Sequence, residues 1–245
     1  MADKPAPKPA APTATGQAPP KTRSGAVDTF LRQVAKVPPR RDAGRRGRLI
    51  FAMDATASRE PTWDRACAIQ GDMFSATDAL GGLEVQLVFY RGYNECKASP
   101  WVSRSADLVR RMTAVHCLGG HTQIGRVLAH AATATRKNKV DALIFVGDAL
   151  EEPVDDLCQT AGELGLLGVP VFIFHEGDDP VAARGFQQIA KLSKGAYCPF
   201  DAASADQLKE LLSAVAVYAA GGRKALLDYS AGRSSAVRLL TQAIK

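Results

Sequence analysis

Three oxygen-bearing side chains stand at alternate positions just after a short apolar stretch. Asp54, Thr56 and Ser58 follow the apolar run 49–53, which is too short for a buried helix and is typical of a strand covered on both faces of a parallel sheet. Carboxylate and hydroxyl oxygens are hard ligands that suit Mg²⁺, Ca²⁺ or Mn²⁺. Asp, Thr and Ser are also ordinary turn and cap residues, so a capped strand-to-helix turn explains this one stretch without an ion.

Two later stretches place oxygen side chains at comparable points of the chain. Thr122 follows a pair of glycines, 119–120, at or near the N-cap of a predicted helix, and Asp148 follows another apolar run, 140–146. Open α/β sheets bind their ligands outside the carboxyl ends of the strands. The sequence therefore predicts that one sheet edge gathers five possible ligands: Asp54, Thr56, Ser58, Thr122 and Asp148.

Strand and helix patterns alternate along the chain, which predicts an α/β fold. We expect a doubly wound, mainly parallel six-stranded sheet with one antiparallel edge strand and helices on both faces. The edge strand returns after a short turn, because a connection of that length allows a hairpin and no parallel crossover. The predicted strands are 49–53, 83–90, 96–103, 140–146, 169–175 and 196–200, and the predicted helices are 27–37, one beginning at Pro61, 105–115, 123–136, 154–167, 182–193 and 205–220.

Composition divides the chain into four parts. Residues 1–24 are rich in Pro, Ala and Lys and are expected to be a disordered leader, and residues 25–47 hold a short amphipathic helix and an Arg-rich linker. The α/β domain spans 48–220, and 221–245 is a C-terminal helical extension with apolar Ala236, Leu239, Leu240 and Ile244. The net charge of +6 belongs to the leader and linker: residues 1–48 hold 11 Lys and Arg against 3 Asp and Glu, whereas the rest holds 20 against 22.

The sequence also bounds the compartment and the class of protein. No apolar stretch approaches the roughly 20 residues of a membrane span, and no apolar signal-peptide core begins the chain. The five cysteines are scattered singly, which indicates free thiols in a reducing cytoplasm. Neither G-x-x-x-x-G-K-[ST] nor a G-x-G-x-x-G after the first strand occurs, which disfavours a P-loop NTPase and a dinucleotide-binding protein.

Taken together, the three motifs resemble those of the von Willebrand factor A (VWA) domain, in particular intracellular bacterial members with a metal-ion-dependent adhesion site (MIDAS). The motifs are DATAS at 54–58, GGHTQIG at 119–125 and IFVGD at 144–148, and the resemblance extends over residues 48–220. It implies a Rossmann-like VWA fold. It also implies that Thr56, Ser58 and Thr122 offer hydroxyls to a Mg²⁺ ion (or Mn²⁺ or Ca²⁺), while Asp54 and Asp148 bind it directly or through water.

The resemblance implies a function in protein interaction and no catalysis. Two formal negative charges leave a divalent cation electrophilic, so that an Asp or Glu of a partner protein can complete its coordination. Intracellular members of the family that the chain resembles commonly act beside ATPases, chaperones, or metal-insertion and stress-response systems. The chain departs from the family pattern at Gly147 and Ala149, which flank Asp148, and at His121, which we expect at the rim of the site. Glu151 and Glu152 follow Asp148 in the sequence. They either support the metal ligands from an outer shell or are surface carboxylates at the start of a helix.

Two other functions compete with this interpretation. The first is a Mg²⁺-dependent phosphohydrolase with Asp54 as nucleophile, but such enzymes need a second acid two residues on, and position 56 is Thr. The second is a nucleic-acid-associated protein that uses the basic segment 1–48. Phe30 is the only aromatic residue in that segment, which counts against stacking on bases.

Overall fold

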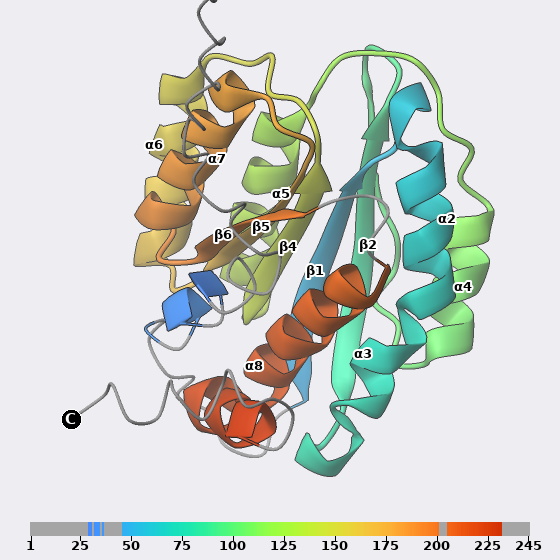
Figure 1. Ribbon diagram of the computed structural model, residues 1–245, viewed down its shortest axis with the longest axis vertical. Coiled ribbons are helices and arrows are strands. Elements are labelled where there is room, and N and C mark those ends of the chain that lie inside the picture. Colours follow the sequence, from blue (N-terminus) through green and yellow to red (C-terminus); the bar gives the residue numbers. More distant parts are fainter. Residues whose placement is uncertain (1–28, 31, 35, 37–45, 201–204, 232–245) are drawn as a thin grey trace, which may run out of the picture.

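The computed structural model describes residues 29–30, 32–34, 36, 46–200 and 205–231, and its centre is a six-stranded sheet (Figure 1). The strands are β1 (Gly47–Asp54), β2 (Leu83–Arg91), β3 (Glu95–Ala98), β4 (Ala142–Gly147), β5 (Val171–Glu176) and β6 (Ala196–Phe200). Their order across the sheet is β3-β2-β1-β4-β5-β6. β2 and β3 pair antiparallel and the other neighbours pair parallel. The predicted fold class is confirmed.

The central strand β1 is buried along its whole length. Leu49, Phe51 and Met53 point into one hydrophobic core, and Ile50 and Ala52 point into the core on the opposite face. This alternation follows from the two-residue period of a strand, and it explains why the stretch is apolar at every position.

Helices cover both faces of the sheet (Figure 1). Residues of the helices on one face share a core with Leu49 and Phe51, and residues of those on the other share a core with Ile50. The first group is α2 (Glu60–Ile69), α3 (Gly71–Ser75), α4 (Ser105–Thr113) and α8 (Ala205–Ala231), and the second is α5 (Ile124–Lys137), α6 (Val154–Leu166) and α7 (Pro180–Leu192). Two 3₁₀ turns, η1 (Ala57–Arg59) and η2 (Asp78–Leu80), complete the connections.

Three elements differ in extent from the sequence prediction. The helix expected after Pro61 is divided into α2 and α3 at Gln70, whose side-chain amide donates a hydrogen bond of 3.0 Å to Ser105. The edge strand ends at Ala98, and beyond it the pairing continues only locally, through the Ser99 amide to the Leu87 oxygen and an isolated bridge from Val102 to Val85. α8 runs past residue 220 to Ala231 through a kink at Gly222, whose φ of 71° suits glycine.

The described part of the predicted helix 27–37 packs on the sheet. Residues 29–30 and 32–34 are helical, and the fully buried Phe30 makes edge-to-face contacts with Phe172 and Phe174 of β5. The leader 1–24, the Arg-rich stretch 40–45 and the apolar residues of 232–245 lie outside the described residues. Within the described part, none of the helices has the length and apolar character that crossing a bilayer requires.

Candidate functional site

The five predicted ligands line one small pocket at the carboxyl edge of the sheet. Asp54 is the last residue of β1, and Asp148 follows β4, the parallel neighbour of β1. The pocket has a volume of about 250 Å³. Its lining comprises Asp54, Thr56, Ala57, Ser58, Gly119, Gly120, Thr122, Asp148, Ala149 and Glu151. The convergence predicted from the positions of these residues is thus present in the fold.

The turn after β1 connects Asp54 to Asp148 through two hydroxyls. Asp54 Oδ1 accepts a hydrogen bond of 2.7 Å from the Thr56 amide, and Thr56 Oγ1 lies 3.4 Å from Ser58 Oγ. Ser58 Oγ then donates to Asp148 Oδ2 at 3.2 Å. Thr56 occupies the N-cap of η1, but its side chain makes no capping hydrogen bond. Helix capping therefore does not explain why a hydroxyl residue stands at position 56, and Thr56 is one of the residues that line the pocket.

The two glutamates after Asp148 hold the loop that carries Thr122. The Thr122 amide donates to Glu151 Oε2 at 2.8 Å, and the Glu151 amide donates to Thr122 Oγ1 at 3.1 Å. Glu152 accepts from the amides of Ile124 and Gly125 at 2.7 and 2.8 Å. Both glutamates thus bind amides at or just before the start of α5 and support the pocket from outside, although the Glu151 side chain is still 50% exposed. Thr122 itself lies one residue before the N-cap, Gln123.

The carboxylate of Asp54 lies in a buried and partly anionic environment. Only 1% of its surface is exposed. Burial raises the pKa of Asp54, the hydrogen bond from Thr56 opposes that shift, and the nearby charge of Asp148 adds to it. The buried hydroxyl of Tyr90, on the neighbouring strand β2, lies close to Asp54, and burial followed by the charge of Asp54 raises its pKa well above the usual value.

A layer of charged and polar residues behind Asp148 was not identified from the sequence. Arg59 is only 2% exposed; its guanidinium forms an ion pair with Glu176 and lies 3.8 Å from Asp148 Oδ2. His175 Nε2 lies 3.2 Å from the backbone oxygen of Asp148, and its Nδ1 lies 2.9 Å from the Tyr197 hydroxyl. The available signal was that β5 ends in His175 and Glu176, at the same sheet edge as Asp54.

Gly147, Ala149 and His121, at which the chain departs from the VWA motif that it resembles, lie in or beside the pocket. A Cβ atom on Gly147 would lie 2.8 Å from Phe145 Cζ, so a side chain at this position would force the buried ring of Phe145 to move. Ala149 lines the pocket. The side chain of His121 is 65% exposed; its Nδ1 lies 3.3 Å from Glu151, and its ring meets Tyr93 edge to face. His121 does not line the pocket, in agreement with the expected rim position.

The donors present fit a hard divalent cation. All five predicted ligands offer oxygen, and two of them are carboxylates whose mutual repulsion a cation would relieve. Within the described ranges, no three His, Cys, Asp or Glu residues cluster in a way that could hold a metal ion. A cation in this pocket would therefore need the hydroxyls as well as the carboxylates.

Comparison with solved structures shows that the chain has the VWA fold. It matches proximal thread matrix protein 1 from the mussel byssus with a TM-score of 0.57 and 15% identity over 73% of this chain and 48% of that one. It matches the SpRpn10 VWA domain with a TM-score of 0.53 and 14% identity over 71% of this chain and 95% of that one. It matches the vWF domain of the pilus tip protein Mfa5 from Porphyromonas gingivalis with a TM-score of 0.55 and 12% identity over 69% of this chain and 93% of that one. The chain thus spans about half the length of the mussel protein. No family model and no curated protein matches the sequence.

Proposed function

We propose that this VWA-fold chain is a metal-dependent protein interaction module without catalytic activity. Its cation would be Mg²⁺, with Mn²⁺ or Ca²⁺ as substitutes, and a partner protein would present an Asp or Glu carboxylate to it. The observation that carries the proposal is one pocket in which five oxygen side chains from three separate stretches meet, two of them carboxylates. A third carboxylate, Glu151, also lines the pocket, but it already accepts the Thr122 amide. The proposed ligands are Asp54, Thr56, Ser58, Thr122 and Asp148.

The exposure of these side chains supports an opening toward a partner. Asp54 and Thr122 are buried at the base of the pocket, whereas Ser58 is exposed. When bound, a divalent cation would supply an electrophilic site for an external carboxylate, because two carboxylates only balance its charge. The volume of about 250 Å³ is below the roughly 300–1,000 Å³ of typical small-molecule pockets and has room for a cation and a carboxylate side chain. These features favour recognition of one acidic side chain over enclosure of a large substrate.

The residues around Asp54 support a binding function over phosphohydrolase activity. A nucleophilic carboxylate must reach the phosphorus atom, but Asp54 is buried and one of its oxygens already accepts the Thr56 amide. The second acid expected of such an enzyme is replaced by Thr56. The alternative of nucleic-acid binding depends on the basic segment 1–48, most of which lies outside the described residues.

We further propose that the module acts in the cytoplasm within a multiprotein assembly, of the kind that includes an ATPase or a chaperone. The cysteines support a reducing compartment, because none of the five is joined to another in a disulfide. Their reactivity is low where burial is deepest: burial raises the pKa of Cys198 to about 12.

The first experiment measures the metal alone. Mn²⁺ binding is followed by electron paramagnetic resonance in the wild-type protein, in Asp148→Asn and in Asp206→Asn, an exposed control at the start of α8. We expect one site, at least tenfold weaker in Asp148→Asn and unchanged in the control. Absence of Mn²⁺ binding, or equal binding by Asp148→Asn, would reject the proposed ligands.

The second experiment measures the partner. Affinity capture in Mg²⁺ and in EDTA should yield a protein that is lost with the chelator and with Asp148→Asn. Capture that is identical in both buffers would contradict a metal-dependent mechanism. An assay of phosphate-ester hydrolysis in Mg²⁺ is expected to show no turnover above the Asp54→Asn variant, and turnover that Asp54→Asn removes would favour the phosphohydrolase.

A further inference from the structure

We propose that the outer edge of β3 is a second docking site, which binds an extended acidic segment of a partner protein as an added β-strand. The proposal is independent of the metal pocket. It rests on the open backbone groups of β3, on grooves along both faces of this edge, and on the charges that surround them.

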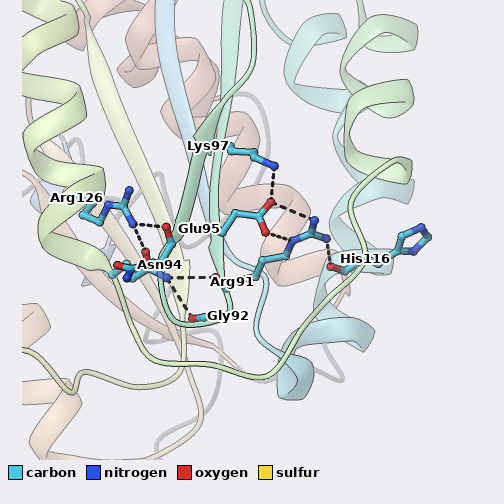
Figure 2. Close-up of polar contacts among 8 residues, drawn as sticks. Arg91, Gly92, Asn94, Glu95, Lys97, His116 and Arg126 are labelled. Carbon is cyan, nitrogen blue, oxygen red and sulfur yellow. Dashed lines mark hydrogen bonds and ion pairs between the residues drawn. The ribbon is translucent and has the colours of Figure 1, made fainter.

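The hydrogen bonds of the hairpin show which backbone groups of β3 point outward. The Ser99 amide donates to the Leu87 oxygen at 2.8 Å, so the alternation of an antiparallel ladder directs the N–H and C=O of Cys96 and Ala98 away from β2. In the turn before β3, the oxygen of Asn94 accepts a hydrogen bond of 2.8 Å from Arg126 Nη1 of α5 (Figure 2). β3 is the last strand of the sheet on this side among the described residues. The edge therefore offers two residues' donors and acceptors to an incoming strand.

Two grooves flank this edge, one on each face of the sheet. The groove toward α4 has a volume of about 570 Å³ and the groove toward α5 about 380 Å³, and Lys97 and Ala98 line both. Leu87 and Phe89 of β2 line the groove toward α4, and Val88 of β2 lines the groove toward α5. Successive side chains of an added strand point to opposite faces, so alternate residues of the partner would enter the two grooves.

The charges on the groove walls select an acidic partner. Five bases line the two grooves, against two acids, which leaves an excess of three positive charges. The acids already have partners: Glu95 is held by Arg91 and Lys97 (Figure 2), and Asp107 by Arg104 and Arg110. Carboxylates on an incoming strand would meet the remaining positive charge. The bases are Arg91, Lys97, Arg110, Arg111 and Arg126, and the acids are Glu95 and Asp107.

The same charges disfavour the other possible occupants. A second copy of the chain would bring two basic edges together, and an edge lysine such as Lys97 opposes that pairing. The ends of this chain do not fit either, because 232–245 holds three bases and no acid, and 1–45 holds nine bases and three acids. The phosphates of a nucleic acid could pair with these arginine and lysine side chains, but phosphates offer no N–H donors to the outward C=O groups of Cys96 and Ala98.

The test uses three labelled peptides in EDTA, so that the metal pocket does not contribute. Fluorescence anisotropy compares an octapeptide of alternating Glu and Val, one of alternating Lys and Val, and one of alternating Glu and Pro, which has the same charge but cannot form a strand ladder. We expect the Glu-Val peptide to bind at least tenfold more tightly than either control. If the Glu-Pro peptide binds as tightly as the Glu-Val peptide, strand addition is refuted. A labelled octathymidylate is measured in the same way, and if it binds more tightly than the Glu-Val peptide, the edge binds nucleic acid instead.

Variants of β3 separate backbone pairing from charge. Ala98→Pro removes one outward N–H that β2 does not use, and we expect about fivefold weaker binding of the Glu-Val peptide, as for one lost hydrogen bond. Lys97→Glu should weaken binding at least tenfold, and Lys191→Glu on α7 should not. Asp148→Asn should bind the peptide as the wild type does, which distinguishes this site from the metal pocket. Wild-type affinity in Lys97→Glu, or dimers in sedimentation that the peptide does not dissociate, would contradict the proposal.

Discussion

Thr122 and Glu151 exchange two hydrogen bonds across 29 residues of sequence, with each backbone amide donating to the side chain of the other residue. The pair fixes the glycine loop before α5 against the segment after β4. It therefore sets the position of the Thr122 hydroxyl relative to Asp148, on which the proposed metal site depends.

Loss of the Glu151 side chain should weaken metal binding without abolishing it. Glu151→Ala removes the acceptor of the Thr122 amide. Loss of a residue that positions a metal ligand typically lowers metal affinity about tenfold or more. Glu151→Gln keeps an oxygen acceptor and should retain most of the affinity. Mn²⁺ titration of both variants measures the difference. An Ala variant with wild-type affinity would show that this pair does not position Thr122.

Glu152 should contribute to stability through the start of α5. Its carboxylate accepts the amides of Ile124 and Gly125, which have no partner within the helix. Glu152→Ala is expected to lower the free energy of unfolding by about 1–2 kcal/mol. Urea denaturation measures this change, and Asp178→Ala, at an exposed loop residue, should stay within about 0.5 kcal/mol. If the two variants lose equal stability, the cap has no special role.

The position of the site was predictable because it follows from local patterns. The apolar run of β1 is buried on both faces and ends at Asp54, and β4 ends just before Asp148, so parallel pairing of the two strands brings the carboxylates to one edge. Short-range sequence rules describe both features well, and the family resemblance supplied their order.

The supports of the site were not predictable, because they are long-range contacts. Glu152 reaches back 28 residues to cap α5, and Arg59 pairs with Glu176 from a different strand. A charged side chain in the sequence gives no sign of its burial until the fold supplies a partner, as it does for Arg59. Gln70 is similar: its bond to Ser105, 35 residues away, accompanies the break between α2 and α3.

Neighbouring glycines in the loop before Thr122 should respond differently to alanine. A Cβ on Gly120 would overlap the backbone of Gly92 in the β2–β3 turn, whereas a Cβ on Gly119 would meet no atom within 4 Å. Gly120→Ala should therefore push the loop from the turn, lower the free energy of unfolding by about 1–3 kcal/mol, and weaken Mn²⁺ binding. Gly119→Ala is the matched control and should change neither. Thermal denaturation with and without Mn²⁺ measures both effects, and equal behaviour of the two variants would refute the predicted close approach.

The Glu95 carboxylate should titrate far below the usual range. Hydrogen bonds from Arg91 and then Lys97 lower its pKa from 4.5 to about 2 (Figure 2). Because the pKa is lower in the folded state, the stability that these bonds provide is complete above about pH 4.5 and is lost as the pH falls toward 2. Carbon-13 NMR titration of the glutamate carboxyls measures the midpoint, and Lys97→Gln should move it part of the way back toward 4.5. A wild-type midpoint near 4.5 would mean that the ion pairs of β3 do not persist in solution.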